Sequence, residues 1–239
     1  MAVDMYSERP LFGGAIASTF PVRFQDVSNV RQVPDHQEVF VDPARDESLI
    51  FELLELKQDV ADNGSATWFL QDLANEQDAE GTMLIEQSGV VEAPGLSFRT
   101  LPAIITTAVG QMDKIKIPNS VYEAPKVPEW QRATLEGNPL KYLSNNVHSQ
   151  AISKGRQGRE AQNLVKVYLA NVRLKEVTTD ILITAYEPIV INSLSESAST
   201  VGAGVAVPAA QAGCMPMAEV FKLAVSTFKV NDWRLFGAA

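Results

Sequence analysis

The sequence is poor in cysteine and histidine, with one cysteine, Cys214, and two histidines among 239 residues. A single cysteine excludes an internal disulfide framework and is typical of a reducing intracellular compartment. His36 and His148 lie far apart, and no further Cys or His stands at metal-ligand spacing from either. We therefore expect no metal site and no cofactor, and we interpret Cys214 as an ordinary thiol.

Basic residues and long apolar runs are also scarce. The chain has 20 Lys and Arg against 29 Asp and Glu, for a net charge of −9, which argues against a nucleic-acid binder held by phosphate contacts. No apolar run reaches the ~18 residues that a membrane-spanning helix needs. The first ten residues include Asp4, Glu8 and Arg9 with no apolar stretch behind them, so we expect no secretory signal.

The familiar motifs of nucleotide binding and of hydrolysis are missing. No loop ends in Gly-Lys-Ser/Thr, the pair Gly202 and Gly204 lacks the third glycine of a dinucleotide fingerprint, and there is no Gly-x-Ser-x-Gly elbow. The basic stretch 154–159 is interpreted as a solvated segment rather than a phosphate or localisation site. The sequence therefore predicts no nucleotide site built on either of these loops.

The acidic charge is concentrated in the first part of the chain. Residues 1–100 carry 18 acidic and 6 basic side chains, or −12, whereas residues 101–239 carry 11 and 14, or +3. Such an acidic half can steer a basic partner toward the protein, or it can simply keep the surface soluble.

Hydrophobic periodicity and turn signals predict an α+β fold, mainly an antiparallel β-sheet flanked by helices. A helix is predicted from Asp46 or Ser48 to about Val60, with Leu49, Ile50, Leu53, Leu54 and Leu56 facing the core. Two further helices are predicted at 65–76 and at about 216–228, and strands are predicted at 15–20, 38–41, 82–87, 98–109, 164–174 and 180–186.

We expect residues 1–239 to form a single domain with two interruptions. The stretch 113–150 has four prolines and no sustained periodicity, which favours a surface insertion. The stretch 193–213 is rich in Ser, Ala, Gly and Val, which predicts a flexible low-complexity loop.

A group of carboxylates is the main candidate for a functional site. On the predicted helix, Glu52 and Glu55 fall within about 60° of each other on the face opposite the core. Such a face can be merely solvated, can supply two carboxylates for acid/base catalysis such as glycoside hydrolysis, or can dock a basic protein. The candidate residues are Asp26, Asp35, Glu38, Asp46, Glu52 and Glu55.

The same part of the chain resembles the Ran guanine-nucleotide release factor family. Five motifs between residues 9 and 55 carry the resemblance in order and spacing, and it continues in the predicted strands 164–174 and 180–186 and in the last residues, 231–237. The five motifs are Arg-Pro-Leu-Phe-Gly-Gly-Ala-Ile at 9–16, Asp-Val-Ser at 26–28, Arg-Gln-Val-Pro-Asp at 31–35, Gln-Glu-Val-Phe at 37–40 and Glu-Ser-Leu-Ile-Phe-Glu-Leu-Leu-Glu at 47–55.

The resemblance implies a fold similar to that of the photosystem II PsbP subunit and a function in nuclear protein import. A protein of this kind binds the GTPase Ran and promotes release of its guanine nucleotide, in the nucleus and cytoplasm, without catalysis of its own. It implies that the acidic candidates bind Ran, and we expect a monomer without nucleic-acid or membrane contacts. A PsbP-like structural subunit and a trafficking adaptor remain as alternatives.

Overall fold

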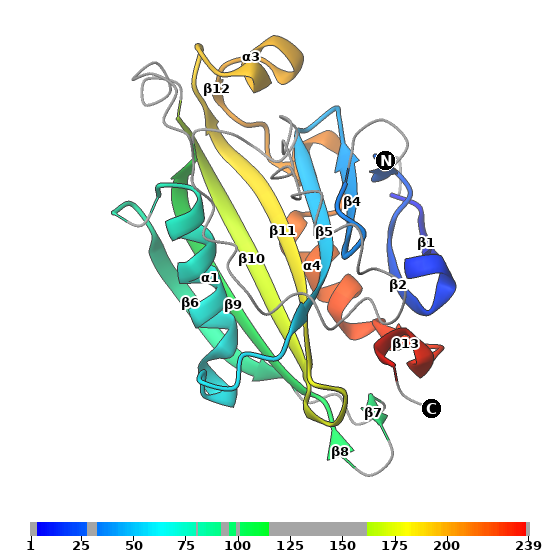
Figure 1. Ribbon diagram of the computed structural model, residues 1–239. Helices are drawn as coiled ribbons and strands as arrows, with labels where there is room; N and C mark the ends of the chain where they lie inside the picture. The colour runs from blue at the N-terminus through cyan, green and yellow to red at the C-terminus, as the bar shows by residue number, and fades with distance from the viewer. Residues whose placement is uncertain are drawn as a thin grey trace, which may run out of the picture.

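The computed structural model describes residues 4–27, 33–79, 81–91, 96–98, 101–114 and 162–237. Its largest part is an eight-stranded antiparallel sheet in the order β3-β4-β5-β11-β10-β9-β6, with β12 paired to the end of β11 (Figure 1). The strands are β3 (Gln25–Asp26), β4 (Gln37–Asp42), β5 (Glu47–Glu55), β6 (Leu84–Val91), β9 (Ile104–Lys114), β10 (Asn163–Leu174), β11 (Thr179–Ile191) and β12 (Gly204–Val205).

A smaller antiparallel sheet lies beside the large one (Figure 1). Its order is β1 (Tyr6–Leu11), β2 (Ile16–Pro21) and β13 (Lys229–Val230), so it joins the two ends of the chain. The turn η1 (Phe12–Gly14) connects β1 to β2, and the turn η7 (Trp233–Phe236) follows β13. Two short strands, β7 (Ser97–Phe98) and β8 (Leu101–Pro102), pair with each other.

Helices cover both faces of the large sheet. Helix α1 (Ser65–Glu76) packs on one face over β9 and β10, whereas α4 (Met217–Ser226) packs on the opposite face and also contacts β2 (Figure 1). One hydrophobic core fills the space between the large sheet, α4 and the small sheet, and a second lies under α1. The remaining elements are η2 (Asp62–Gly64), η5 (Lys175–Val177), α3 (Glu196–Val201) and η6 (Ala209–Ala212).

The α+β class and most of the predicted elements are confirmed. Helix α1 occupies the predicted residues 65–76, and α4 lies within the predicted 216–228. The predicted strands correspond to β2, β4, β6, β9, β10 and β11, with ends that differ by a few residues. The predicted strand 98–109 is wrong in its first part, because residues 98 and 101–102 belong to the separate β7–β8 pair and β9 runs from 104 to 114. Among the described residues, no helix has both the length and the apolar composition that crossing a membrane requires.

The predicted helix from 46 or 48 to about 60 is wrong. Residues Glu47–Glu55 form β5, a strand between β4 and β11. Its side chains alternate, so Leu49 and Leu53 enter the core on the α4 side while Ile50 and Leu54 pack toward the α1 side. A strand buried on both faces is apolar at almost every position, and such a run also satisfies the spacing of a helix.

The structure describes only part of the two predicted interruptions, 113–150 and 193–213. Residues 113 and 114 belong to β9 and pair with β10, so the predicted insertion begins too early, and its remainder, 115–150, lies outside the described residues. His148 and the basic stretch 154–159 also lie outside them. The stretch 193–213 contains α3, β12 and η6.

Candidate functional site

Four of the six candidate carboxylates lie on or next to β4, toward one margin of the large sheet. Asp26 lies on the edge strand β3, opposite Phe40 of β4, and Asp35 lies in the turn that leads into β4. Glu38 is on β4 itself, and Glu52 lies on β5 directly opposite Gln37. We call Asp26, Asp35, Glu38 and Glu52 the acidic edge.

Glu38 is the most constrained carboxylate of the acidic edge. The backbone N–H of Phe12 donates a hydrogen bond of 2.5 Å to its Oε1 atom. Partial burial raises the pKa of Glu38, the Phe12 hydrogen bond opposes this by favouring the ionised form, and the nearby charge of Asp26 raises the pKa further. The Glu38 carboxylate is therefore fixed in place and costly to keep charged.

The turn that supplies this N–H has an unusual backbone. Phe12 has a φ of 49°, which is rare for a residue with a large side chain, and Gly13 and Gly14 have φ values of 66° and 89°. A Cβ atom built on either glycine would meet nothing within 4 Å. The two glycines are thus needed for their backbone conformation rather than for space.

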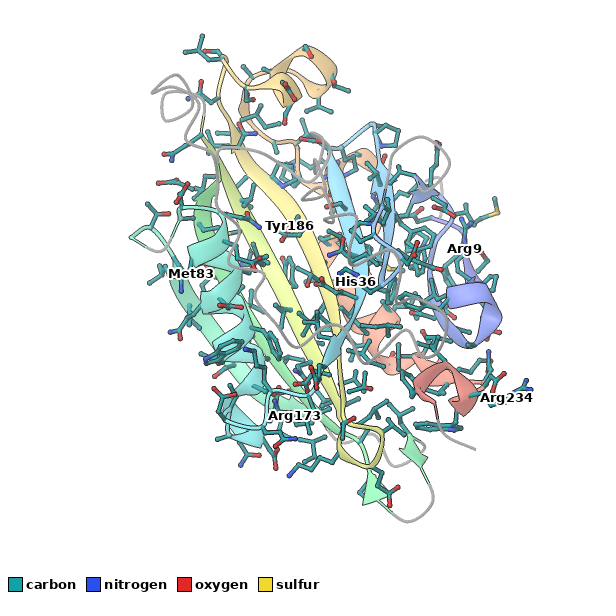
Figure 2. All side chains as sticks on the ribbon, in the orientation of Figure 1. Arg9, His36, Met83, Arg173, Tyr186 and Arg234 are labelled. Atoms are coloured by element: carbon teal, nitrogen blue, oxygen red, sulfur yellow. The ribbon has the colours of Figure 1, made fainter. Side chains whose placement is uncertain are left out.

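Glu52 points to the other face of the sheet and is held by its neighbours on β4 and the preceding turn. Gln37 donates a hydrogen bond of 2.6 Å from Nε2 to Glu52 Oε1, and His36 Nε2 lies 3.5 Å from the same oxygen. Figure 2 shows His36 beside β5. About a quarter of the Glu52 side chain, 23%, remains exposed. The acidic edge therefore presents negative charge on both faces of the β4–β5 pair.

Helix α1 extends the negative charge on the face where Glu52 lies. Burial, together with the neighbouring charges of Asp72 and Glu52, raises the pKa of Glu76 to about 7. Burial also raises the pKa of Asp72, although the charge of Lys57 opposes it. These carboxylates repel one another, which a cationic partner would relieve.

The two remaining candidates are placed differently from the prediction. Glu55 ends β5 and is exposed, but three residues along a strand put it on the face opposite Glu52, so the predicted shared helix face is wrong. Asp46 is 5% exposed and sits in the turn before β5 with a φ of 54°. A buried side chain of this kind does not form part of an open docking surface.

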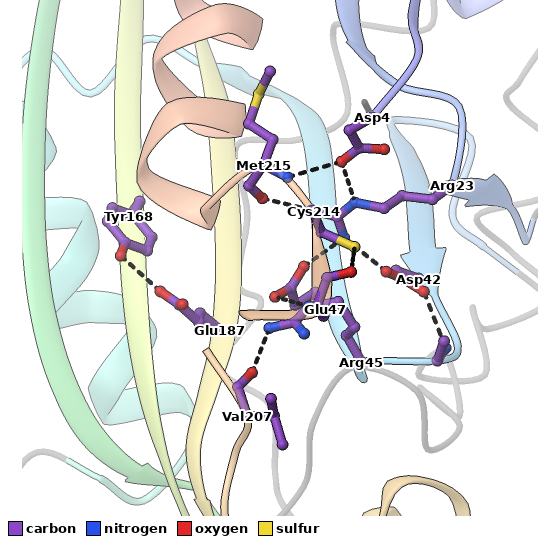
Figure 3. Close-up of polar contacts among 12 residues, drawn as sticks. Asp4, Arg23, Asp42, Arg45, Glu47, Tyr168, Glu187, Val207, Cys214 and Met215 are labelled. Carbon is purple, nitrogen blue, oxygen red and sulfur yellow. Dashed lines mark hydrogen bonds and ion pairs between the residues drawn. The ribbon is translucent and has the colours of Figure 1, made fainter. Parts of the chain in front are cut away.

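A buried ion network supports the strands that carry the acidic edge (Figure 3). Glu47, the fully buried first residue of β5, accepts hydrogen bonds from Arg23 at 2.6 Å and from Arg45 at 2.8 Å. Arg23 also pairs with Asp42 at 2.7 Å and with Asp4 at 2.9 Å. The network therefore links the N-terminal segment to the β4–β5 hairpin.

A second arginine, Arg173, is buried on β10 near one end of the large sheet (Figure 2). Arg173 is 2% exposed and donates to the carboxylates of Asp180 and Asp62 and to the carbonyls of Val60 and Lys57. It lines a hollow of about 240 Å³ together with Lys57 and Lys175. Because five hydrogen bonds occupy its guanidinium, this hollow does not offer Arg173 to a ligand.

The sequence did not point to several residues that shape the site. Phe12 acts through its backbone N–H, which no side-chain pattern reveals, and His36 and Gln37 gain their role only through the register of β4 with β5. Among residues that the structure describes, no group of three or more His, Cys, Asp or Glu side chains has the arrangement to hold a metal ion.

Comparisons with known proteins agree on one family. A family model described as Ran-interacting Mog1 protein matches residues 9–188. A Ran guanine nucleotide release factor of Danio rerio is 32% identical over 194 residues, covering 80% of this chain and 83% of that protein. A probable Ran guanine nucleotide release factor of Dictyostelium discoideum is 28% identical over 235 residues, covering 98% and 97%.

The fold has a solved counterpart. The crystal structure of the Ran-binding protein Mog1p of Saccharomyces cerevisiae matches with a TM-score of 0.54 and 21% sequence identity, covering 98% of this chain and 99% of that one. At this identity the match shows a shared fold and nothing more specific.

Proposed function

Because this chain belongs to the family of Ran-interacting Mog1 proteins, we propose that it binds the small GTPase Ran through the acidic edge and promotes release of the bound guanine nucleotide. The observation that carries the proposal is the family match over residues 9–188, which includes every residue of the acidic edge. The protein then acts as a regulator of a GTPase, with no reaction of its own.

The electrostatics of the site support a cationic partner. Asp26 and Asp35 are exposed, and Glu38 and Glu52 are half-buried and oriented by hydrogen bonds. Exposed charges raise the rate of encounter with a basic surface, and oriented charges that become buried in the complex contribute most to its lifetime. The acidic edge offers both kinds within one margin of the sheet.

Release of nucleotide follows from competition for positive charge. A GTPase holds its nucleotide phosphates with a loop lysine and Mg²⁺. Carboxylates brought near these groups compete with the phosphates and lower the affinity for nucleotide. Release occurs only if the protein binds the nucleotide-free form of Ran more tightly than the loaded form, since equal affinity shifts no population.

The cellular role that fits this activity is support of nuclear protein import, with the protein working in both the nucleus and the cytoplasm. Relatives from two yeasts carry the name nuclear import protein, at 40% identity over 70 residues and 52% over 40 residues. A monomer is sufficient for the activity, because the acidic edge is formed within one chain.

The direct test is nucleotide release from Ran loaded with a fluorescent GTP analogue. We expect Glu38→Gln to slow release and to weaken Ran binding by about tenfold or more, as for an oriented interface charge, and Asp35→Lys to slow release mainly by lowering the rate of association with Ran. Glu38→Gln is informative because the amide oxygen can still accept the Phe12 hydrogen bond while the charge is gone.

The matched control for Asp35→Lys is Glu219→Lys, which makes the same charge reversal on α4 at an exposed position. This variant should release nucleotide as the wild type does. If Asp35→Lys and Glu38→Gln also behave as wild type, the acidic edge is not the Ran site. If the wild-type protein neither binds Ran nor releases its nucleotide, the proposed function itself is wrong.

A further inference from the structure

Three segments that are distant in the sequence meet around the turn Phe12–Gly14. The turn after β1 supplies the Phe12 N–H, β4 supplies the Glu38 carboxylate, and the segment after β13 holds the far side of the turn. Asn231 donates from Nδ2 to the Gly14 carbonyl at 3.2 Å and from its backbone N–H to the Ala15 carbonyl at 2.8 Å. Asn231 lies outside the residues that the family model matches, so this support is not part of that match.

The turn is held in a conformation that it would not adopt by itself. A φ of 49° at Phe12 is unfavourable for a residue with a Cβ, and such positions persist only where the surroundings determine them. Here the surroundings are the Phe12 hydrogen bond to Glu38 on one side and the Asn231 hydrogen bonds on the other. The conformation directs the Phe12 N–H toward β4.

Glu38 needs this support to present a charge. Its side chain has three rotatable bonds, and its burial disfavours the ionised form. A hydrogen bond from a backbone N–H to a carboxylate is charge-assisted, so it both fixes the rotamer and favours ionisation. Without the bond, the Glu38 carboxylate would lose its fixed direction and would bind protons more readily.

From these contacts we infer that the segment Leu11–Gly14, braced by Asn231, is a positioning device for Glu38 and sets the affinity for a basic partner through the Phe12 N–H. The inference rests on the proposed function, because the affinity in question is that for Ran. It adds residues that carry no charge and never need to touch the partner.

A double-mutant cycle tests the device. Gly13→Val puts a β-branched residue at a φ of 66° and should distort the turn. We expect this change to weaken Ran binding by about tenfold in the wild-type background, the loss typical of one hydrogen bond to a charged group, but less than twofold in a Glu38→Ala background. Gly13→Asn should retain wild-type affinity, because Asn tolerates the left-handed conformation.

The control is Gly64→Val, which makes the same change where φ is −106° and where a Cβ also has open space. It should leave Ran affinity unchanged. If Gly13→Val does not fold, Asn231→Ala replaces it in the cycle, because Asn231 is exposed and this change removes only its side-chain hydrogen bond to the Gly14 carbonyl, while the backbone bond to Ala15 remains.

The outcomes separate the two proposals. Equal losses from the turn variant in both backgrounds would mean that the turn acts on stability in general, and the positioning inference would then be overturned. Wild-type Ran binding by Glu38→Ala itself would instead overturn the assignment of the acidic edge. Loss in Gly13→Asn as large as in Gly13→Val would also contradict the inference, since conformation would not be the cause.

Discussion

The backbone N–H of Phe12 and the carboxylate of Glu38 form a 2.5 Å hydrogen bond across 26 residues of sequence. The bond joins the turn of the small sheet to the margin of the large one, and so connects segment 9–16 with segment 37–40. The turn in the first segment thereby fixes the direction of the Glu38 side chain in the second.

The first prediction concerns the ionisation of Glu38. Burial and Asp26 raise its pKa above the usual value for a glutamate despite the Phe12 hydrogen bond. Glu38 is therefore neutral at pH values where an ordinary glutamate is still charged, and Ran binding should weaken as the pH falls through this raised pKa. The measurement is an NMR titration of the Phe12 amide proton, whose shift should follow the Glu38 carboxylate.

Glu38→Gln is the control for that titration. The Phe12 amide shift should then show no step that belongs to residue 38. A Phe12 amide that does not respond to pH in the wild type would show that the hydrogen bond is absent in solution.

The second prediction concerns Glu76 and the pH dependence of stability. Its pKa rises from 4.5 in the unfolded chain to about 7 in the folded protein. The folded state therefore binds more protons between these values, and this group makes the protein more stable as the pH falls from above 7 toward 4.5. Glu76→Gln should remove that dependence and should stabilise the protein at pH 8 by about 1 kcal/mol, a figure reduced for solvent screening.

Urea unfolding at pH 5 and pH 8 provides the measurement. The difference between wild type and Glu76→Gln should be larger at pH 8 than at pH 5. Asn75→Gln is the control, because it changes the adjacent uncharged residue of α1, and its effect should not change with pH. A Glu76→Gln difference that is largest at pH 5 has the opposite sign and would contradict the raised pKa.

Much of the fold could be predicted from the sequence wherever the spacing of apolar residues fits only a helix or only a strand. Helix α1 is amphipathic, with Phe69, Leu70 and Ala74 buried against the sheet, so its limits were predictable from spacing and from Asn63-Gly64 before it. In segment 47–55 the spacing does not distinguish a helix from a strand, because the adjacent residues Ile50 and Phe51 are both apolar and pack into different cores. Helical spacing and burial on two faces of a strand then look alike.

The candidate carboxylates could be selected from the sequence, but their arrangement could not. Charge density and the motifs identified Asp35, Glu38 and Glu52, whereas the assumption of a helix paired Glu52 with Glu55. Only the register of β4 with β5 places Glu52 opposite Gln37. One feature of the sequence could have indicated that 47–55 is a strand. Asp42 Oδ1 accepts a hydrogen bond from the Ala44 N–H, as in an Asx turn, and the turn Pro43–Asp46 joins two antiparallel strands.

The third prediction separates Glu52 from Glu55. Because they lie on opposite faces of β5, reversing each charge should have distinct effects on Ran binding. Glu52→Lys should speed dissociation by about tenfold, because this carboxylate is oriented by Gln37 and His36. Glu55→Lys, at an exposed strand end, should mainly reduce the association rate at low salt.

Surface plasmon resonance between ~50 and 200 mM salt measures both rates. The Glu55→Lys defect should shrink as salt rises, since exposed charges are screened, whereas the Glu52→Lys defect should persist. Identical salt dependence in the two variants would argue against their separation by the strand.

The last prediction concerns the buried ion network and rests on the contrast between buried and exposed pairs. Glu47 is fully buried between Arg23 and Arg45, so Glu47→Ala would leave two half-buried guanidinium groups with fewer partners in a poorly solvated site. Breaking a buried pair from one side typically costs ~3–5 kcal/mol of unfolding free energy, and the loss should appear in urea unfolding.

The control is Glu219→Ala, which breaks an exposed ion pair. The side chains of Glu219 and Lys222 are 56% and 70% exposed, so this change should cost less than ~1 kcal/mol of unfolding free energy. A cost for Glu47→Ala as small as that for Glu219→Ala would mean that water replaces the lost carboxylate, and that the hairpin carrying the acidic edge is held by its hydrophobic packing instead.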